Sequence, residues 1–171
     1  MGMSLENMVS VLQSWKAFKK RRMNVPDLTY RIQTATVSDV ERHLLLCKDN
    51  FIPALDTSVD IQHYANKIVK NSITFEAWDK QVLAGLIAAY FNDPQNQTGY
   101  ITNVSTLGGY ARRGIASRLL EQCIGYARKK KFGEIRLEVH RDNPQAKQLY
   151  AKYEFRPTGD TEQLTQMTLH L

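Results

Sequence analysis

The chain has 171 residues, of which 43% are hydrophobic and 23% are charged, and its formal net charge is +6. This length and composition are typical of one globular domain with its own core, so a disordered chain, a collagen or a coiled-coil rod is excluded. The longest apolar run, over residues 82–91, is far shorter than the roughly 20 residues that a membrane-spanning helix needs, so we expect no membrane span.

The positive charge favours a polyanionic partner, and coenzyme A, nucleic acid and anionic lipid all fit that description. Cys47 and Cys123 are too few for a disulfide framework, and each sits in an apolar helical pattern, so we predict buried free thiols. The N-terminus does not follow the pattern of an export signal, so we expect a cytoplasmic protein. The four histidines show no paired spacing with other ligands, so we predict no metal site.

The first predicted element is an amphipathic helix over residues 4–22. Its apolar residues recur at intervals of three and four: Leu5, Met8, Val9, Leu12, Trp15 and Phe18. Residues 1–24 hold five basic residues against one acidic residue, so they carry +4 of the net charge. We therefore divide the chain into an N-terminal helix, 1–24, and a domain, 25–171. We expect the helix to pack on that domain or on a second subunit of a homodimer, with an anionic membrane or nucleic acid as alternatives.

The remaining elements alternate between strand and helix patterns. Alternating or continuous apolar runs predict strands over residues 30–34, 73–78, 82–91, 100–107, 134–140 and 163–171. Three- and four-residue periodicity and capping residues predict helices over residues 39–48, 60–70, 113–131 and 143–153. Asp79, Lys80 and Gln81 join the second and third strands as a hairpin turn.

The most informative segment is GGYARRGIA, residues 108–116, which lies between a predicted strand and an amphipathic helix. A helix N-terminus presents unpaired amides and a partial positive charge to a phosphate, and small residues allow the phosphate to approach. The spacing is neither that of a Walker loop nor that of a dinucleotide-binding GxGxxG motif. A strand-to-helix turn with a purely structural role is the alternative.

Three segments together resemble the GCN5-related N-acetyltransferases, over residues 29–171. They are ARRGIASRLL at 111–120, IRLEV at 135–139 and NPQAKQLYAKYEF at 143–155. The resemblance implies a mixed α/β fold, in which a central, mostly antiparallel sheet has splayed fourth and fifth strands and helices on both faces. It also implies acetyl-CoA as the co-substrate. Gly114 and Ala116 match the family's phosphate-binding turn, while Ala111 stands where the family has Gln or Arg.

The resemblance also implies where acetyl-CoA binds. The pyrophosphate would lie against the turn and the start of the helix, which are formed by Ala111, Arg112, Arg113, Gly114, Ile115, Ala116 and Ser117. Asn143 matches the family asparagine near the pantetheine arm. Val104 and Thr106 stand where the backbone of the fourth strand pairs with pantetheine, and the Val104 amide would polarise the acetyl carbonyl.

Tyr150 matches the family tyrosine that faces the thiol, so we predict that it protonates the leaving thiolate. Its helical spacing with other apolar residues also fits a core aromatic. Direct transfer needs a neutral amine, so a base must remove a proton from an ammonium group. Glu138 and His140 alternate on one face of the fifth strand and are the first candidates, with Glu76 as a third. For each of them, a structural role is the alternative.

We therefore predict an N-acetyltransferase that moves an acetyl group directly from acetyl-CoA to a primary amine of a small molecule, such as an amino sugar or a polyamine. Residues 51–64 should rim the acceptor pocket, with Asp56 and Asp60 available to attract a cation. We expect no nucleic-acid partner. The alternative is a non-catalytic acyl-CoA-binding module whose basic N-terminal helix docks on a partner or an anionic membrane.

Overall fold

The computed structural model describes residues 27–93 and 95–171, and the predicted N-terminal helix lies outside this part of the chain. The strands are β1 (Thr29–Ile32), β2 (Ile73–Asp79), β3 (Val82–Asp93), β4 (Thr98–Thr106), β5 (Glu134–His140), β6 (Arg156–Asp160) and β7 (Leu164–His170). The helices are α2 (Val37–Cys47), α3 (Ile61–Asn71), α4 (Ile115–Lys129) and α5 (Pro144–Lys152), with short 3₁₀ turns at Lys48–Asn50, Leu55–Thr57 and Gly108–Tyr110.

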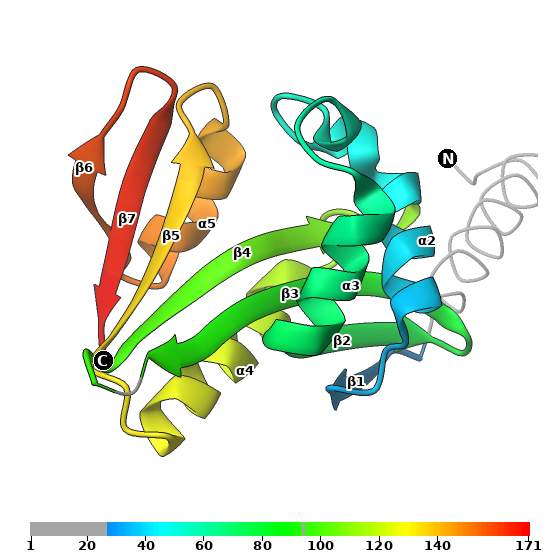
Figure 1. The fold of residues 1–171 in the computed structure, drawn as a ribbon, viewed down its shortest axis with the longest axis horizontal. Coiled ribbons are helices and arrows are strands. Elements are labelled where there is room, and N and C mark those ends of the chain that lie inside the picture. The colour runs from blue at the N-terminus through cyan, green and yellow to red at the C-terminus, as the bar shows by residue number, and fades with distance from the viewer. Residues whose placement is uncertain (1–26, 94) are drawn as a thin grey trace, which may run out of the picture.

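The seven strands form one sheet in the order β1-β2-β3-β4-β5-β7-β6 (Figure 1). Every neighbouring pair is antiparallel except β4 and β5, which run parallel. The predicted mixed α/β fold with a mostly antiparallel sheet is therefore confirmed.

Helices cover both faces of the sheet (Figure 1). On one face, Val40 and Leu44 of α2 pack with Ile68 of α3 against buried residues of β2 and β3. On the other face, the apolar stripe of α4 forms a second core together with residues of β2–β5, α5 and β7. Gly85 of β3 allows α4 to approach closely, because a β-carbon there would lie 2.5 Å from Cγ2 of Ile115.

The parallel strands β4 and β5 separate along their length. Thr98–Ile101 pair with Glu134–Leu137, and no pairing between the two strands continues beyond Leu137. On the other edge of β4, the register with β3 shifts, because Ala88 pairs with Asn103 and Ala89 pairs with Ile101. Thr102 is thus the extra residue of a β-bulge, which bends the strand where the two strands part.

Local capping explains why the helices begin where they do. Asp60 caps α3 by accepting a hydrogen bond from the amide of His63, and Asn143 caps α5, which begins with Pro144, as predicted. α2 begins two residues before the predicted start at residue 39, because Thr36 and Asp39 form a reciprocal capping box. The fully exposed edge strand β6 was not predicted, because it has no apolar alternation to reveal it.

Cys47 and Cys123 are buried free thiols, as predicted. Within residues 27–93 and 95–171, no helix is both long and apolar enough to span a bilayer.

Candidate active site

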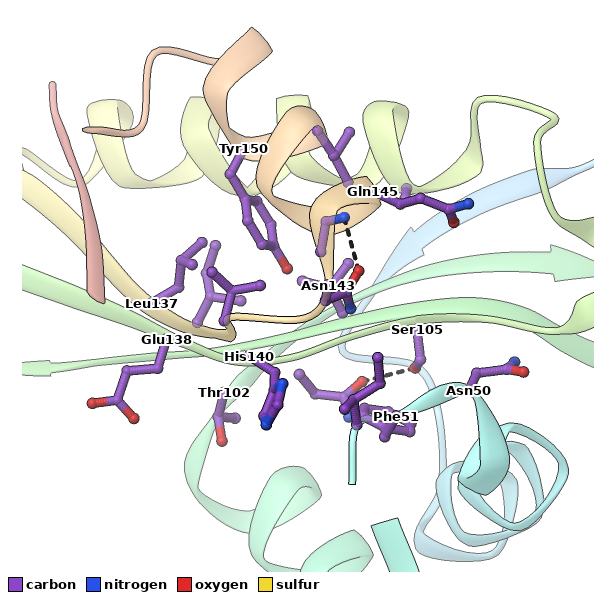
Figure 2. Close-up of a pocket in the computed structure, with 18 of the residues that line it drawn as sticks. Asn50, Phe51, Thr102, Ser105, Leu137, Glu138, His140, Asn143, Gln145 and Tyr150 are labelled. Atoms are coloured by element: carbon purple, nitrogen blue, oxygen red, sulfur yellow. Dashed lines mark hydrogen bonds between the residues drawn. The ribbon is translucent and has the colours of Figure 1, made fainter. Parts of the chain in front are cut away.

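A cleft of about 430 Å³ opens where β4 and β5 part (Figure 2). Its walls are residues 101–106 of β4 and 137–140 of β5, and its ends are closed by Ala116 of α4, the first turns of α5 and residues 50–52. Val104, Thr106, Asn143 and Tyr150 all line it, as do Glu138 and His140. The structure therefore brings most of the predicted site residues to one place.

The backbone of β4 turns the polar groups of two residues toward this cleft. The amide of Leu107 donates to the carbonyl of Ala84 on β3. In an antiparallel ladder the backbone direction alternates, so Ser105 also points its backbone groups to β3, while Val104 and Thr106 point theirs to the opposite edge. The side-chain amide of Asn50 donates to the Thr106 carbonyl at 3.4 Å, from the cleft side. The backbone groups of Val104 and Thr106 thus face the cleft.

The glycine turn before α4 has a backbone that suits an anion. Gly114 is the N-cap of α4 with φ of +75°, and it provides no side-chain cap. The first intrahelical bond runs from the amide of Arg118 to the carbonyl of Gly114, so the amides of Ile115, Ala116 and Ser117 have no partner within the helix. A β-carbon on Gly114 would meet nothing within 4 Å, so the space before these amides is open to a phosphate.

Basic side chains flank this turn. Ala111, Arg112 and Arg113 are exposed, and Arg112 adopts a left-handed backbone with φ of +60°. The guanidinium of Arg113 lies 5.5 Å from the centre of the Tyr110 ring, whose hydroxyl donates to Asp79 at 2.7 Å. Arg113 thus lies over the Tyr110 ring beside the turn.

Asn143 has a structural role as well as a place in the cleft. Its Oδ1 atom accepts a hydrogen bond of 3.0 Å from the amide of Ala146 in the first turn of α5. The cap fixes the start of the helix that carries Tyr150.

Tyr150 points its hydroxyl into the cleft from α5 (Figure 2). The residue is 7% exposed, and its ring packs against Phe155 with centroids 5.9 Å apart. Burial raises the pKa of the Tyr150 phenol, so it remains protonated at neutral pH. The ring therefore belongs to the core, as its helical spacing indicated, while the hydroxyl faces the cleft.

Glu138 reaches the opposite side of the cleft. Figure 2 shows its side chain with Thr102 and His140 on the side of the strands away from Tyr150. Glu138 is exposed, and within the described part of the chain its carboxylate forms no ion pair. Burial raises the pKa of Tyr100 to about 12, and the adjacent Glu138 carboxylate adds to the effect. Glu138 thus lies beside Tyr100 of β4.

His140 also lines the cleft, but its ring is already engaged. Its Nδ1 atom accepts a hydrogen bond of 3.2 Å from the amide of Asp142. In the neutral ring the proton is then on Nε2, so neither nitrogen has a free lone pair for an incoming ammonium group. This bond makes Glu138 the stronger of the two candidates for the base.

Three predicted acidic residues do not line the cleft. Glu76 is fully buried and accepts five hydrogen bonds, which tie the segment before α2 to β2. Asp56 pairs with Lys48 at 2.6 Å, and Asp60 caps α3. The predictions of Glu76 as a base and of Asp56 and Asp60 as cation-attracting groups were therefore wrong, because each carboxylate has a structural partner.

Of the predicted rim, residues 51–64, only Phe51 and Ile52 line the cleft, next to Asn50. Sequence reasoning missed Thr102 and Tyr64. The Tyr64 hydroxyl donates to the Thr102 carbonyl at 2.9 Å and fastens α3 to the bulge of β4. A bulge inside an alternating strand leaves no local sequence signal, so this contact could not be predicted.

Comparison with known proteins identifies the family. Residues 39–155 match the model of the acetyltransferase (GNAT) family. The chain belongs to the GNAT acetyltransferases. It is thus an acyl-CoA-dependent N-acetyltransferase whose acetyl donor is acetyl-CoA, as the resemblance implied. No curated protein matches the chain.

Solved structures of other GNAT proteins have the same fold. A GNAT-family acetyltransferase from Desulfovibrio desulfuricans superposes with a TM-score of 0.70 at 13% identity, covering 84% of this chain and 98% of its own. PaiA N-acetyltransferase from Thermoplasma acidophilum, in complex with coenzyme A, superposes with a TM-score of 0.65 at 16% identity, covering 84% of this chain and 99% of its own. The ribosomal-protein-S18-alanine N-acetyltransferase from Escherichia coli superposes with a TM-score of 0.65 at 18% identity, covering 83% of this chain and 94% of its own.

Proposed function

We propose that this GNAT acetyltransferase transfers the acetyl group directly to a primary amine of a small molecule. One observation carries the proposal: the cleft between β4 and β5 has Tyr150 on one side and the exposed carboxylate of Glu138 on the other. A proton donor and a proton acceptor on opposite sides of one cleft suit a transfer in which a thiolate leaves and an ammonium group loses a proton.

The donor half of the site would be formed by the glycine turn and the edge of β4. The amides of Ile115, Ala116 and Ser117, with Arg112 and Arg113 beside them, fit the pyrophosphate. The cleft-facing backbone groups of Val104 and Thr106, together with Asn143, fit the pantetheine arm. When bound, acetyl-CoA supplies the activated acetyl group.

The residues around the thioester then have separate tasks. The Val104 amide donates to the acetyl carbonyl oxygen and stabilises the negative charge that develops there. The Tyr150 hydroxyl donates its hydrogen bond and proton to the sulfur as it leaves, because burial keeps the phenol protonated.

The acceptor half lies on the side of Glu138. An alkylammonium with a pKa of about 10.4 is almost fully protonated at neutral pH, so a nearby carboxylate both attracts it and takes its proton. Tyr100 and Thr102 flank Glu138, and Phe51 adds an apolar wall. These features favour an amine on a short chain, for which amino sugars and polyamines are the first candidates.

The proposal is tested by an acceptor screen with the full chain. Acetyl-CoA is incubated with amino sugars, polyamines and short peptides with free α-amino groups, while thiol release and the acetylated product are measured by absorbance and mass spectrometry. Peptides are included because the Escherichia coli neighbour is named for an alanine of a ribosomal protein. Product formed only from small amines supports the proposal. Product formed only from peptides overturns the acceptor class, and tight acetyl-CoA binding without any product favours a non-catalytic module.

A further inference from the structure

Three buried polar side chains connect the cleft to the layer of α2 and α3. They are His43 on α2 and Ser105 and Asn103 on β4, and they are 2%, 7% and 3% exposed, respectively. Ser105 and Asn103 line the cleft, and Figure 2 labels Ser105. We call His43, Ser105 and Asn103 the polar chain. Buried polar groups are expensive unless they are paired, and the proposed transfer uses none of these three side chains.

The hydrogen bonds of the polar chain have a fixed direction at His43. Its Nδ1 atom lies 2.7 Å from the carbonyl oxygen of Leu83 on β3, and a carbonyl only accepts, so Nδ1 carries a proton. Burial lowers the pKa of His43 to about 4, so the ring is neutral at pH 7. Its Nε2 atom is therefore an acceptor, and the shorter of its two contacts is with Ser105 Oγ at 2.8 Å, against 3.6 Å to Sγ of Cys47, so it accepts the Ser105 hydroxyl proton.

Asn103 extends the polar chain toward the bulge. Its Oδ1 atom lies 2.8 Å from Ser105 Oγ, and its buried Nδ2 atom forms no hydrogen bond of good geometry within the described part of the chain, although the Tyr64 hydroxyl lies nearby. Ser105 has one proton for two acceptors. With the amide turned by 180°, Asn103 donates to Ser105 while Ser105 donates to His43, so both contacts become hydrogen bonds.

The polar chain acts on the part of β4 that has lost its neighbour. Beyond Ile101 this strand has no pairing with β5, and the bulge at Thr102 weakens its register with β3. Ser105 stands between Val104 and Thr106, whose backbone groups face the cleft. Anchoring its side chain to His43, which is itself anchored to β3, fixes the rotation of this segment about the strand axis.

We propose that the polar chain is a positioning device for acetyl transfer, in which His43 holds Ser105 so that the backbone groups of Val104 and Thr106 point into the cleft. This inference rests on the proposed function for its catalytic part, because the Val104 amide must meet the acetyl carbonyl there. A displacement of about 1 Å at such a site is enough to reduce the rate by a factor of about 10².

The test compares two removals of a buried serine hydroxyl. Ser105→Ala should lower kcat for acetyl transfer about ten- to a hundredfold and raise the Kd for acetyl-CoA. Ser72→Ala is the matched control, because the Ser72 hydroxyl is also buried, donates to the Ile68 carbonyl at 2.7 Å and lies outside the cleft. It should lower the Tm but leave kcat and the Kd for acetyl-CoA unchanged.

A second variant tests the connection to α2. The shorter amide of His43→Asn still reaches the Leu83 carbonyl from the position of Nδ1 but no longer reaches Ser105. It should reproduce the loss in kcat of Ser105→Ala, and the double variant should be no slower than either single variant. If the losses in kcat of the two single variants multiplied in the double variant, His43 and Ser105 would act independently and not through the hydrogen bond between them.

The outcomes separate this inference from the proposed function. If the wild-type chain acetylates amines and Ser105→Ala keeps the wild-type kcat and Kd while only its Tm falls, the polar chain is merely structural and the inference is overturned. If the wild-type chain acetylates none of the amines, the proposed function fails. In that case the test of the polar chain is the Kd for acetyl-CoA, measured by calorimetry. An unchanged Kd in Ser105→Ala would show that the polar chain does not position the backbone groups of Val104 and Thr106.

Discussion

Tyr150 and Glu138 line the same cleft from opposite sides of the splayed strands β4 and β5. Tyr150 comes from a helix on the face covered by α4 and α5, whereas Glu138 projects to the side of α2 and α3. Where β4 and β5 separate, the cleft is open to both faces of the sheet. The acetyl donor and the amine acceptor of the proposed reaction can therefore enter from opposite faces and meet at the edge of β4 that does not pair with β5.

Tyr150→Phe should reduce the single-turnover rate of acetylation by a factor of about 10² to 10⁴ and leave acetyl-CoA affinity unchanged, because it removes the hydroxyl and keeps the buried ring. Tyr153→Phe is the matched control, since the Tyr153 hydroxyl donates to Glu121 at 2.9 Å, away from the cleft. Quenched-flow measurements at saturating amine separate the chemical step from product release. Equal rates for the two variants would return Tyr150 to a packing role.

Glu138→Gln should slow acetylation at neutral pH by at least about tenfold while leaving acetyl-CoA binding intact, because the amide cannot accept the proton of the ammonium group. The deficit should shrink as the pH rises toward the pKa of the amine, because the neutral amine becomes about tenfold more abundant per pH unit. Glu134→Gln on the same strand is the control, since Glu134 pairs with Arg136 at 2.6 Å where β4 and β5 are still joined. A deficit that does not vary with pH would argue against Glu138 as the base.

Gly114→Val should weaken acetyl-CoA binding in calorimetry by at least about tenfold. The branched side chain occupies the open space before the first amides of α4, and φ of +75° strains any residue with a β-carbon. Gly125→Ala is the control, because this exposed glycine lies inside α4, where alanine favours the helix. Wild-type affinity in a folded Gly114→Val protein would remove the turn from the binding site.

The sequence predicted those features that are written locally. The caps Asp60 and Asn143 precede their helices directly, and the glycine turn precedes α4, so neighbouring residues were enough to find them. Features that join distant segments could not be predicted. The contact of Tyr100 with Glu138 joins two strands, and three of the five hydrogen bonds of Glu76 come from Thr34 and Ala35, some 40 positions away. A carboxylate in sequence thus says little about whether it serves catalysis or structure until its partners are known.

The buried ring of His43 should make stability depend on pH in a defined window. Its pKa is 6.5 when unfolded and about 4 in the folded protein. As the pH falls, the His43 ring therefore binds a proton in the unfolded chain before it does so in the folded protein. The free energy of unfolding is unaffected above pH 6.5 and decreases between pH 6.5 and about pH 4, by about 3 kcal/mol in all. Urea unfolding at several pH values should show this loss, and His43→Gln should flatten the profile between pH 6.5 and 4.5. If the stability of the wild type and of His43→Gln fell in parallel with pH, the lowered pKa of His43 would not be the cause of the loss.

Glu76→Gln should show the opposite behaviour to Glu138→Gln, with lower stability and an unchanged kcat. Burial by itself would raise the pKa of Glu76, but hydrogen bonds from Thr34, Thr74, Ala35 and Trp78 outweigh it and lower the pKa. Glutamine keeps one acceptor oxygen and puts an NH₂ group where the second oxygen accepts the indole N–H of Trp78 at 2.9 Å.

Leaving that buried donor unpaired costs about 1–3 kcal/mol, which urea unfolding at pH 7 would detect. Because the lowered pKa belongs to a carboxylate, its contribution to stability is present above pH 4.5 and is lost as the pH falls through the folded pKa. The difference between wild-type and Glu76→Gln stability should therefore narrow in acid. A fall in kcat with an unchanged free energy of unfolding would restore Glu76 as a candidate base. A free energy of unfolding lower by about 1–3 kcal/mol, with an unchanged kcat, assigns Glu76 to anchoring the segment before α2.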